Sequence, residues 1–129
     1  MGQQQLLLIV LGVIVVGIAV VVGINLFNAN ATSANRDGVI SDLNNLGAMA
    51  QQYFKKPTSM GGGGNDFTGW TIPTGLDSTA NGTYTISNGP SSTTVGITGT
   101  GTEIGTDGSA KVSAVATVTA TTITVAVSN

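Results

Sequence analysis

The stretch MGQQQLLLIVLGVIVVGIAVVVGINLF, residues 1–27, decides the fold of this chain, because it holds an apolar run that is unsuited to water. From Leu6 to Val22 every residue is Leu, Ile, Val, Ala or Gly, and the first charged residue of the chain is Arg36. A helix that is apolar on every side has no face to offer to solvent. Burying each Leu, Ile or Val side chain contributes roughly 1.5–3 kcal/mol. We therefore expect this segment to lie in a membrane or in a protein core.

A secretory signal peptide or a conventional single-pass anchor explains the apolar run less well. A signal peptide has a basic start and a shorter apolar core, whereas glutamines at positions 3–5 precede this run, although Ala29-Asn30-Ala31 resembles a cleavage site. A conventional anchor usually carries Lys or Arg on its cytoplasmic side, and none precedes this run. The pattern indicates that a basic leader has been removed.

The composition excludes several classes of function. A chain of 129 residues has room for one modest domain besides the apolar run. Four basic residues and a net charge of -2 argue against nucleic acid and anionic lipid as partners. The absence of Cys and His removes thiolate and imidazole ligands, Cys nucleophiles and His bases. Since no nucleophile–base pair or paired-carboxylate pattern occurs either, we expect a non-enzyme without a cofactor or a metal.

The helical pattern continues beyond the apolar run and becomes one-sided. Apolar residues recur at spacings of three and four, which places them on one stripe of a helix: Val39, Leu43, Leu46, Ala50 and Tyr53. The other faces, which we expect to be wet or to face another subunit, carry Asn30, Asn35, Arg36, Asp37, Asp42, Asn44, Asn45 and Gln51. Lys55, Lys56 and Pro57 are typical of a helix end. A single helix from about Gln3 to Lys56 would be about 80 Å long.

The second half of the chain changes to a period of two. A Gly-rich connecting loop is expected over residues 57–82, pinned to the domain by Phe67, Trp70 and Ile72. Four short segments rich in Thr and Val then predict antiparallel strands: TYTIS from Thr83, TTVGITG from Thr93, KVSAVATV from Lys111 and TITVAV from Thr122. One sheet face would be apolar, and the other would carry mostly Thr, Ser and Ala.

These elements predict an α+β fold, with a long N-terminal helix packed on an antiparallel sheet of about four strands. A one-sided sheet needs a cover, and the apolar stripe of the helix can supply it. Residues 1–27 would form the apolar N-terminal helix and residues 28–129 a globular domain. Within that domain we expect an amphipathic helix at 28–56, the loop at 57–82 and the sheet at 83–129.

This arrangement resembles the major subunits of type IV pili and, more broadly, the type IV filament superfamily. The shared features are the charge-free apolar helix, its amphipathic continuation to near Lys56, and the loop and sheet that follow. The resemblance covers the whole architecture, and its first half is the specific part. It implies that a prepilin peptidase removes a short basic leader and that the new N-terminus is methylated.

The resemblance leaves two positions open for the mature N-terminus. Met1 is one, and Gln3, after cleavage behind Gly2, is the other. The bacterial family usually has a glutamate at the fifth mature position, whereas this chain has Gln5 or Leu7 there, depending on the register. This departure puts in question the usual charge pairing with the amino terminus of a neighbouring subunit.

The resemblance also implies a function, that of a structural subunit of an extracellular pilus-like filament or fimbrium, with a role in cell adhesion. Identical subunits would pack their apolar helices along the filament axis after starting in the cytoplasmic (inner) membrane, with the pilus assembly machinery and prepilin peptidase as further partners. The core-packing residues would be Leu6, Leu7, Leu8, Ile9, Val10, Leu11, Val13, Ile14, Val15, Val16, Ile18, Val20, Val21 and Val22. Gly12, Gly17 and Gly23 would either loosen this helix in the polymer or permit close helix–helix approach.

Two other functional classes stay in view, a membrane-anchored β-rich binding module and a short periplasmic pseudopilin of a secretion system. An anchor has no need of so long a helix without a basic flank. Bacterial and archaeal lineages both stay open.

The remaining motifs are weak. Gly61 to Gly64 lacks the ending of a phosphate-binding loop. The glycosylation sequons at Asn30 and Asn81 are candidates for modification. Calcium is bound in some relatives of the superfamily, but the acids of this chain lack EF-hand spacing and are interpreted as solvated loop residues: Asp66, Asp77, Glu103 and Asp107.

Overall fold

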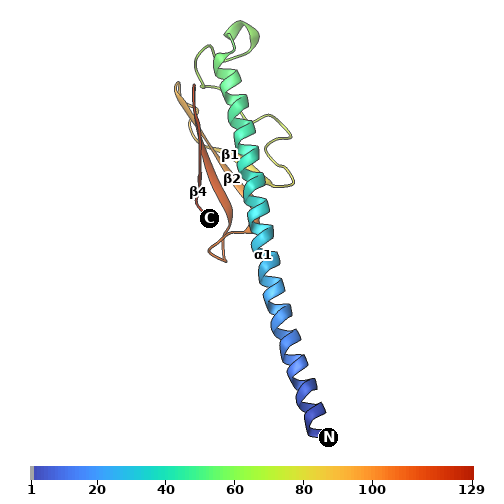
Figure 1. Cartoon of the computed structure of the whole chain (residues 1–129). Helices are drawn as coiled ribbons and strands as arrows, with labels where there is room; N and C mark the ends of the chain where they lie inside the picture. Colours follow the sequence, from blue (N-terminus) through green and yellow to red (C-terminus); the bar gives the residue numbers. More distant parts are fainter. Residues whose placement is uncertain (1) are drawn as a thin grey trace. The chain divides into compact units, whose positions relative to one another are not determined.

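The computed structural model describes residues 2–129 as one long helix followed by a four-stranded antiparallel sheet (Figure 1). This confirms the predicted α+β fold, with the helix packed against the sheet. The elements are α1 (Gly2–Lys55), the short 3₁₀ helix η1 (Thr58–Met60), β1 (Gly82–Asn88), β2 (Thr94–Ile104), β3 (Lys111–Thr119) and β4 (Ile123–Val127).

The chain divides into two compact units, and α1 contributes to both of them. The N-terminal unit is helical and ends at Ala31, and the globular unit comprises Thr32–Asn129. The sequence predicts a boundary after residue 27, and the contacts within the structure divide the chain after Ala31.

The sheet is a simple meander in the order β1-β2-β3-β4. Each strand is antiparallel to the next, as in hairpins that follow one another along the chain. The register pairs Val95 with Val118 and Val118 with Ile123, and it pairs Ile86 with Ile97. Because directly paired residues point to the same side of a sheet, the apolar residues of all four strands share one face.

The core of the globular unit lies between this sheet face and the second half of α1. The predicted stripe is confirmed, since Val39, Leu43, Leu46 and Ala50 are all buried. Tyr53 is partly buried against the same core. The loop and the sheet complete the buried set with Phe67, Trp70, Tyr84, Val95, Ile97, Val112, Ala114, Ala116 and Val118.

Two expectations about this core are corrected. Ala114 and Ala116 belong to the buried face, between Val112 and Val118, because the strand alternates strictly along β3. Small side chains are found there because α1 lies over the sheet. Asn35, expected on an outer face of the helix, is also buried, with 8% of its surface exposed.

The glycine run after α1 has a structural task that the sequence reading missed. The backbone N–H groups of Gly63 and Asn65 donate to the carbonyls of Tyr53 and Phe54, at 2.7 and 2.6 Å. These carbonyls belong to the last turn of α1, which has no intrahelical donors left for them. A Cβ at Gly63 would collide with the carbonyl of Asp66, so the close turn requires glycine. The run caps the helix.

Candidate functional site

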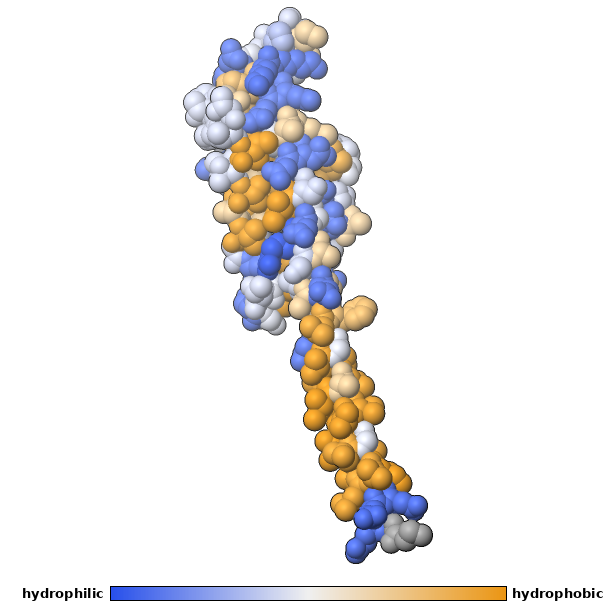
Figure 2. Space-filling view, in the orientation of Figure 1, coloured by the Kyte–Doolittle hydropathy of each residue, from blue (hydrophilic) through white to orange (hydrophobic). Residues whose placement is uncertain are grey.

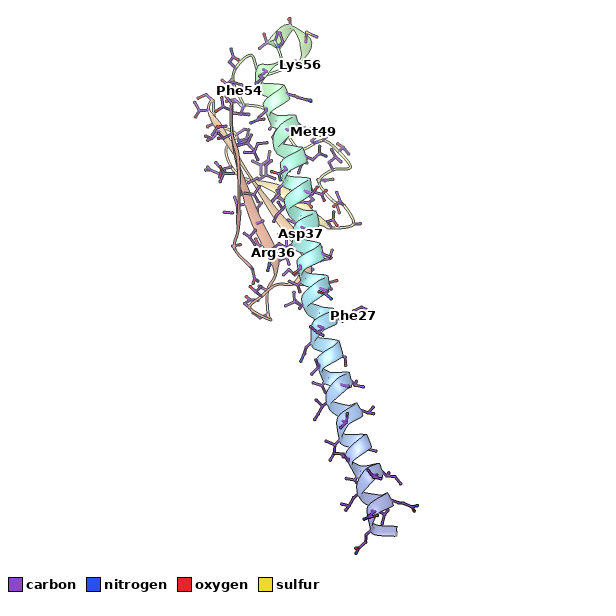
Figure 3. All side chains as sticks on the ribbon, in the orientation of Figure 1. Phe27, Arg36, Asp37, Met49, Phe54 and Lys56 are labelled. Atoms are coloured by element: carbon purple, nitrogen blue, oxygen red, sulfur yellow. The ribbon has the colours of Figure 1, made fainter. Side chains whose placement is uncertain are left out.

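The candidate site is the apolar segment of α1, which we define as residues 6–27. In the single chain, the large apolar side chains of this segment are all exposed, with exposed fractions from 51% at Val22 to 80% at Phe27. Figure 2 shows the segment as a continuous hydrophobic surface, and Phe27 projects from the helix in Figure 3. All residues that the sequence assigns to core packing belong to this exposed set.

This segment is long and apolar enough to cross a membrane. Leaving its side chains in water would cost on the order of tens of kcal/mol. The helical conformation also suits a membrane, because the hydrogen bonds of the helix pair the backbone N–H and C=O groups, which lipid cannot do. The segment is therefore built to be covered by lipid, by protein or by both.

The three glycines of the segment are not required by packing within the chain. A Cβ at Gly12, Gly17 or Gly23 would meet no atom within 4 Å, and α1 is an unbroken helix through all three. Gly47 differs, because a Cβ there would lie 3.0–3.2 Å from side-chain atoms of Ile123 and Val118. Within the described chain, nothing near Gly12, Gly17 or Gly23 excludes a larger side chain.

One of the two expected processing sites, Gln3, lies at the start of the helix. Met1 lies outside the described residues. Gln3 and Gln5 are exposed residues of the first turns of α1.

Asn35 joins α1 to the sheet through a fully used side-chain amide. Its Nδ2 donates to the carbonyl of Asn81 (2.7 Å) and to Oγ1 of Thr102 (3.2 Å). Its Oδ1 accepts from the backbone N–H groups of Thr102 and Glu103, at 3.1 and 3.3 Å. Burial of an amide is tolerated when each of its polar atoms is paired. The signal was available in the sequence, because Asn35 lies one turn before Val39 on the same stripe.

Asp42 forms a second polar connection, which joins α1 to the loop before β1 and to β1 itself. Its Oδ2 accepts from Oγ1 of Thr79 (2.8 Å), from Nδ2 of Asn81 (3.1 Å) and from the hydroxyl of Tyr84. Burial raises the pKa of Asp42, but the hydrogen bonds from Tyr84, Asn81 and Thr79 outweigh it and hold this pKa below its usual value. Burial, together with the bond to Asp42, raises the pKa of Tyr84. The carboxylate and the neutral phenol are thus both stabilised in the folded state.

The two sequons differ in access. Asn30 is exposed on α1. Asn81 is half-buried, and its Nδ2, the atom that would carry a glycan, donates to Asp42. A glycan at Asn81 would therefore disturb the Asp42 connection, whereas one at Asn30 would not.

The loop acids are dispersed rather than gathered. Within residues 2–129, no three His, Cys, Asp or Glu side chains are placed to hold a metal ion. Asp66 accepts a hydrogen bond from the backbone of Thr68 at 2.7 Å, and Asp107 accepts from Ser109 and Ala110. These two carboxylates organise their own turns, as Asp commonly does.

Comparisons with protein-family models, with curated proteins and with solved structures find no match for this chain.

Proposed function

We propose that this chain is the structural subunit of a type IV pilus-like helical filament and that it polymerises through its apolar segment. The observation that carries the proposal is that this segment is exposed on every side and has no charged residue. The same helix continues into the globular unit. A simple anchor needs lipid contact only. A segment that serves in lipid first and in a polymer afterwards must lack unpaired charges, because both surroundings penalise them.

The globular unit would lie outside the filament core under this proposal. Much of its surface is hydrophilic, as a unit that faces solvent requires, and one face carries an apolar patch (Figure 2). Polar connections through Asn35 and Asp42 fasten the second half of α1 to the rest of the globular unit. Processing by a prepilin peptidase and passage through the membrane before assembly belong to the same proposal.

The test is electron microscopy of surface material sheared from cells that produce the full chain, labelled with antibodies against the globular unit. We expect long filaments that are labelled along their length. Label confined to the cell envelope would contradict the proposal and favour the anchored binding module, and short assemblies that never leave the envelope would favour the pseudopilin. Cells that lack the chain provide the control.

A further inference from the structure

We propose that Asn88 and Gly89, at the end of β1, form a site of spontaneous covalent modification, where the chain converts its own asparagine into aspartate and isoaspartate. The reaction consumes one water, releases one ammonia and needs no enzyme. The chain has two Asn-Gly dipeptides, at 81–82 and 88–89, and their surroundings in the structure are opposite. The proposal does not depend on the proposed filament.

The reaction is an attack of the main chain on a side chain. A base in the solvent removes the proton from the backbone nitrogen of Gly89, and this nitrogen attacks Cγ of Asn88. The new N–C bond closes a succinimide ring, the bond between Cγ and Nδ2 breaks, and ammonia leaves with a proton from water. Water then opens the ring, at Cγ to give aspartate or at the backbone carbonyl of Asn88 to give isoaspartate. Glycine speeds the attack, because it has no side chain to crowd the nitrogen.

Asn88 and Gly89 have the freedom that this reaction needs. Both are exposed, and Gly89 lies just beyond the last residue of β1. The hydrogen bonds of the following loop are made by Ser91 with Thr93 and Thr94. Within residues 2–129, neither the side-chain amide of Asn88 nor the N–H of Gly89 makes a hydrogen bond. The nitrogen and the carbon that it attacks can therefore meet without breaking other contacts.

The turn after β1 also requires glycine at position 89. The backbone angle φ of Gly89 is +84°, and a Cβ there would lie 2.7 Å from the backbone nitrogen of Ser91. Residues with a Cβ rarely adopt this conformation. A larger residue, which would slow the cyclisation, is therefore unsuited to this position.

The other dipeptide, Asn81–Gly82, is held by hydrogen bonds and by packing. Nδ2 of Asn81 donates to Oδ2 of Asp42 at 3.1 Å, and the carbonyl of Asn81 accepts from Nδ2 of Asn35 at 2.7 Å. The N–H of Gly82 donates to the carbonyl of Thr79 at 3.3 Å, and Gly82 is buried in β1. Cyclisation at this site requires a local opening of these contacts first.

The modification changes the end of the β1–β2 hairpin. Either product adds one negative charge to a chain whose net charge is -2. Isoaspartate also adds a methylene group to the main chain at the residue that pairs with Gly96. The pairing is already irregular there, because the register shifts between Ile86 and Asn88. We therefore expect the change to stay local and the rest of the globular unit to remain folded.

Mass spectrometry of the wild-type full-length chain tests the proposal. The chain, in membranes or detergent, is incubated at mildly alkaline pH in water enriched in heavy oxygen, which labels only the product that forms before digestion. Cleavage by chymotrypsin after Tyr84 places Asn81 and Asn88 on separate peptides. We expect labelled aspartate and isoaspartate to form at Asn88 at least about tenfold faster than at Asn81, because even a modest free energy of local opening lowers the rate by that factor.

Unfolding the chain supplies the control. In concentrated guanidinium chloride both dipeptides lose their surroundings, and the two rates should become similar. Asn88→Gln should remove the fast product, because its longer side chain closes a larger ring more slowly. Equal rates in the folded chain, or no labelled product at Asn88, would overturn the proposal. A difference that persists in the denaturant would also overturn it, because the neighbouring sequence and not the fold would then set the rates.

Discussion

The two halves of α1 have the same backbone and opposite relations to the rest of the chain. Over residues 6–27 every side of the helix is apolar, and the large apolar side chains are at least half exposed. Over Thr32–Lys55 a single stripe is apolar, and the sheet buries it completely at Val39, Leu43 and Ala50. The apolar side chains of the second half are buried within one molecule. Those of the first half can be buried only by surroundings that the single chain does not supply.

The comparison teaches where a mutation should be felt. Changes in the second half act on the stability of the globular unit, because its partners are in the same chain. Changes in the first half should leave that unit intact and act on membrane insertion or assembly. The predictions below test this division, from the largest expected effect to the smallest.

The largest effect is expected from a charge in the first half. Val15→Asp or Val16→Arg should abolish filaments under the proposed function, because a buried unpaired charge costs several kcal/mol and recurs in every subunit. The globular unit should remain folded. Filament yield by electron microscopy and circular dichroism of the globular unit provide the two readouts.

A matched control lies in the other half of the same helix. Ala48→Asp places the same charge on an exposed position of α1 within the globular unit, and filament yield should stay near normal. Filaments of normal abundance from the Val15→Asp chain would show that this position is not in a dry core.

A large effect on stability is expected from Leu43, which is fully buried between α1 and the sheet. Leu43→Ala should lower the free energy of unfolding by about 2–5 kcal/mol, through lost burial and the cavity left behind. Urea denaturation of the fragment 28–129 measures this change, and we expect that fragment to be soluble and monomeric. Leu11→Ala in the full chain should not change the free energy of unfolding of the globular unit. An equal loss from Leu43→Ala and Leu11→Ala would contradict the difference between the two halves of α1.

The sequence predicted the framework of the fold because its signals were periodic. The stripe from Val39 to Tyr53 and the four Thr- and Val-rich strands repeat with the period of their element. The apolar run is recognised by its length instead, and the structure has all of these elements. The loop anchors Phe67 and Trp70 could be predicted as large apolar residues in a polar segment.

The parts that sequence reasoning missed depend on contacts between distant residues. Asn35 is polar by composition, and only the positions of Thr102 and Glu103 reveal that its amide is satisfied inside. The capping role of the glycine run depends on the positions of the carbonyls of Tyr53 and Phe54, which accept its hydrogen bonds. For the candidate site, the sequence identified the apolar segment, whereas the open space around Gly12, Gly17 and Gly23 became visible only in the structure.

A smaller effect is expected from pH, through Asp42. Its pKa in the folded state lies below the ordinary value of 3.8, so the unfolded chain takes up a proton first as the pH falls. Asp42 therefore contributes stability that is fully present above this value and is lost as the pH drops through the folded-state pKa.

Asp42→Asn should remove this contribution and cost about 1 kcal/mol at neutral pH, since the partly exposed carboxylate loses charged hydrogen bonds. Urea denaturation of the fragment 28–129 between pH 7 and pH 2.5 measures it. The wild-type and variant stabilities should converge at the acid end. Asp37→Asn, at an exposed position of the same helix, should unfold with the same dependence on pH as the wild type. A constant difference in unfolding free energy between wild type and Asp42→Asn at all pH values would refute the contribution of Asp42 ionisation.

The smallest effect concerns Gly17, in the middle of the first half of α1. Alanine favours a helix by about 1 kcal/mol over glycine, and a Cβ at Gly17 has open space in the single chain. Gly17→Ala should therefore leave the isolated chain helical and intact in the membrane.

In an assembled filament, neighbouring side chains can shield a backbone that leaves the helix, which lipid does not permit. We predict a locally extended backbone between Gly12 and Gly23 there, and a helix restored around position 17 in the variant. A filament map at side-chain resolution measures both. Unbroken helical density from Leu6 through Phe27 in the wild type would reject the extended segment and leave close helix–helix approach as the reason for these glycines.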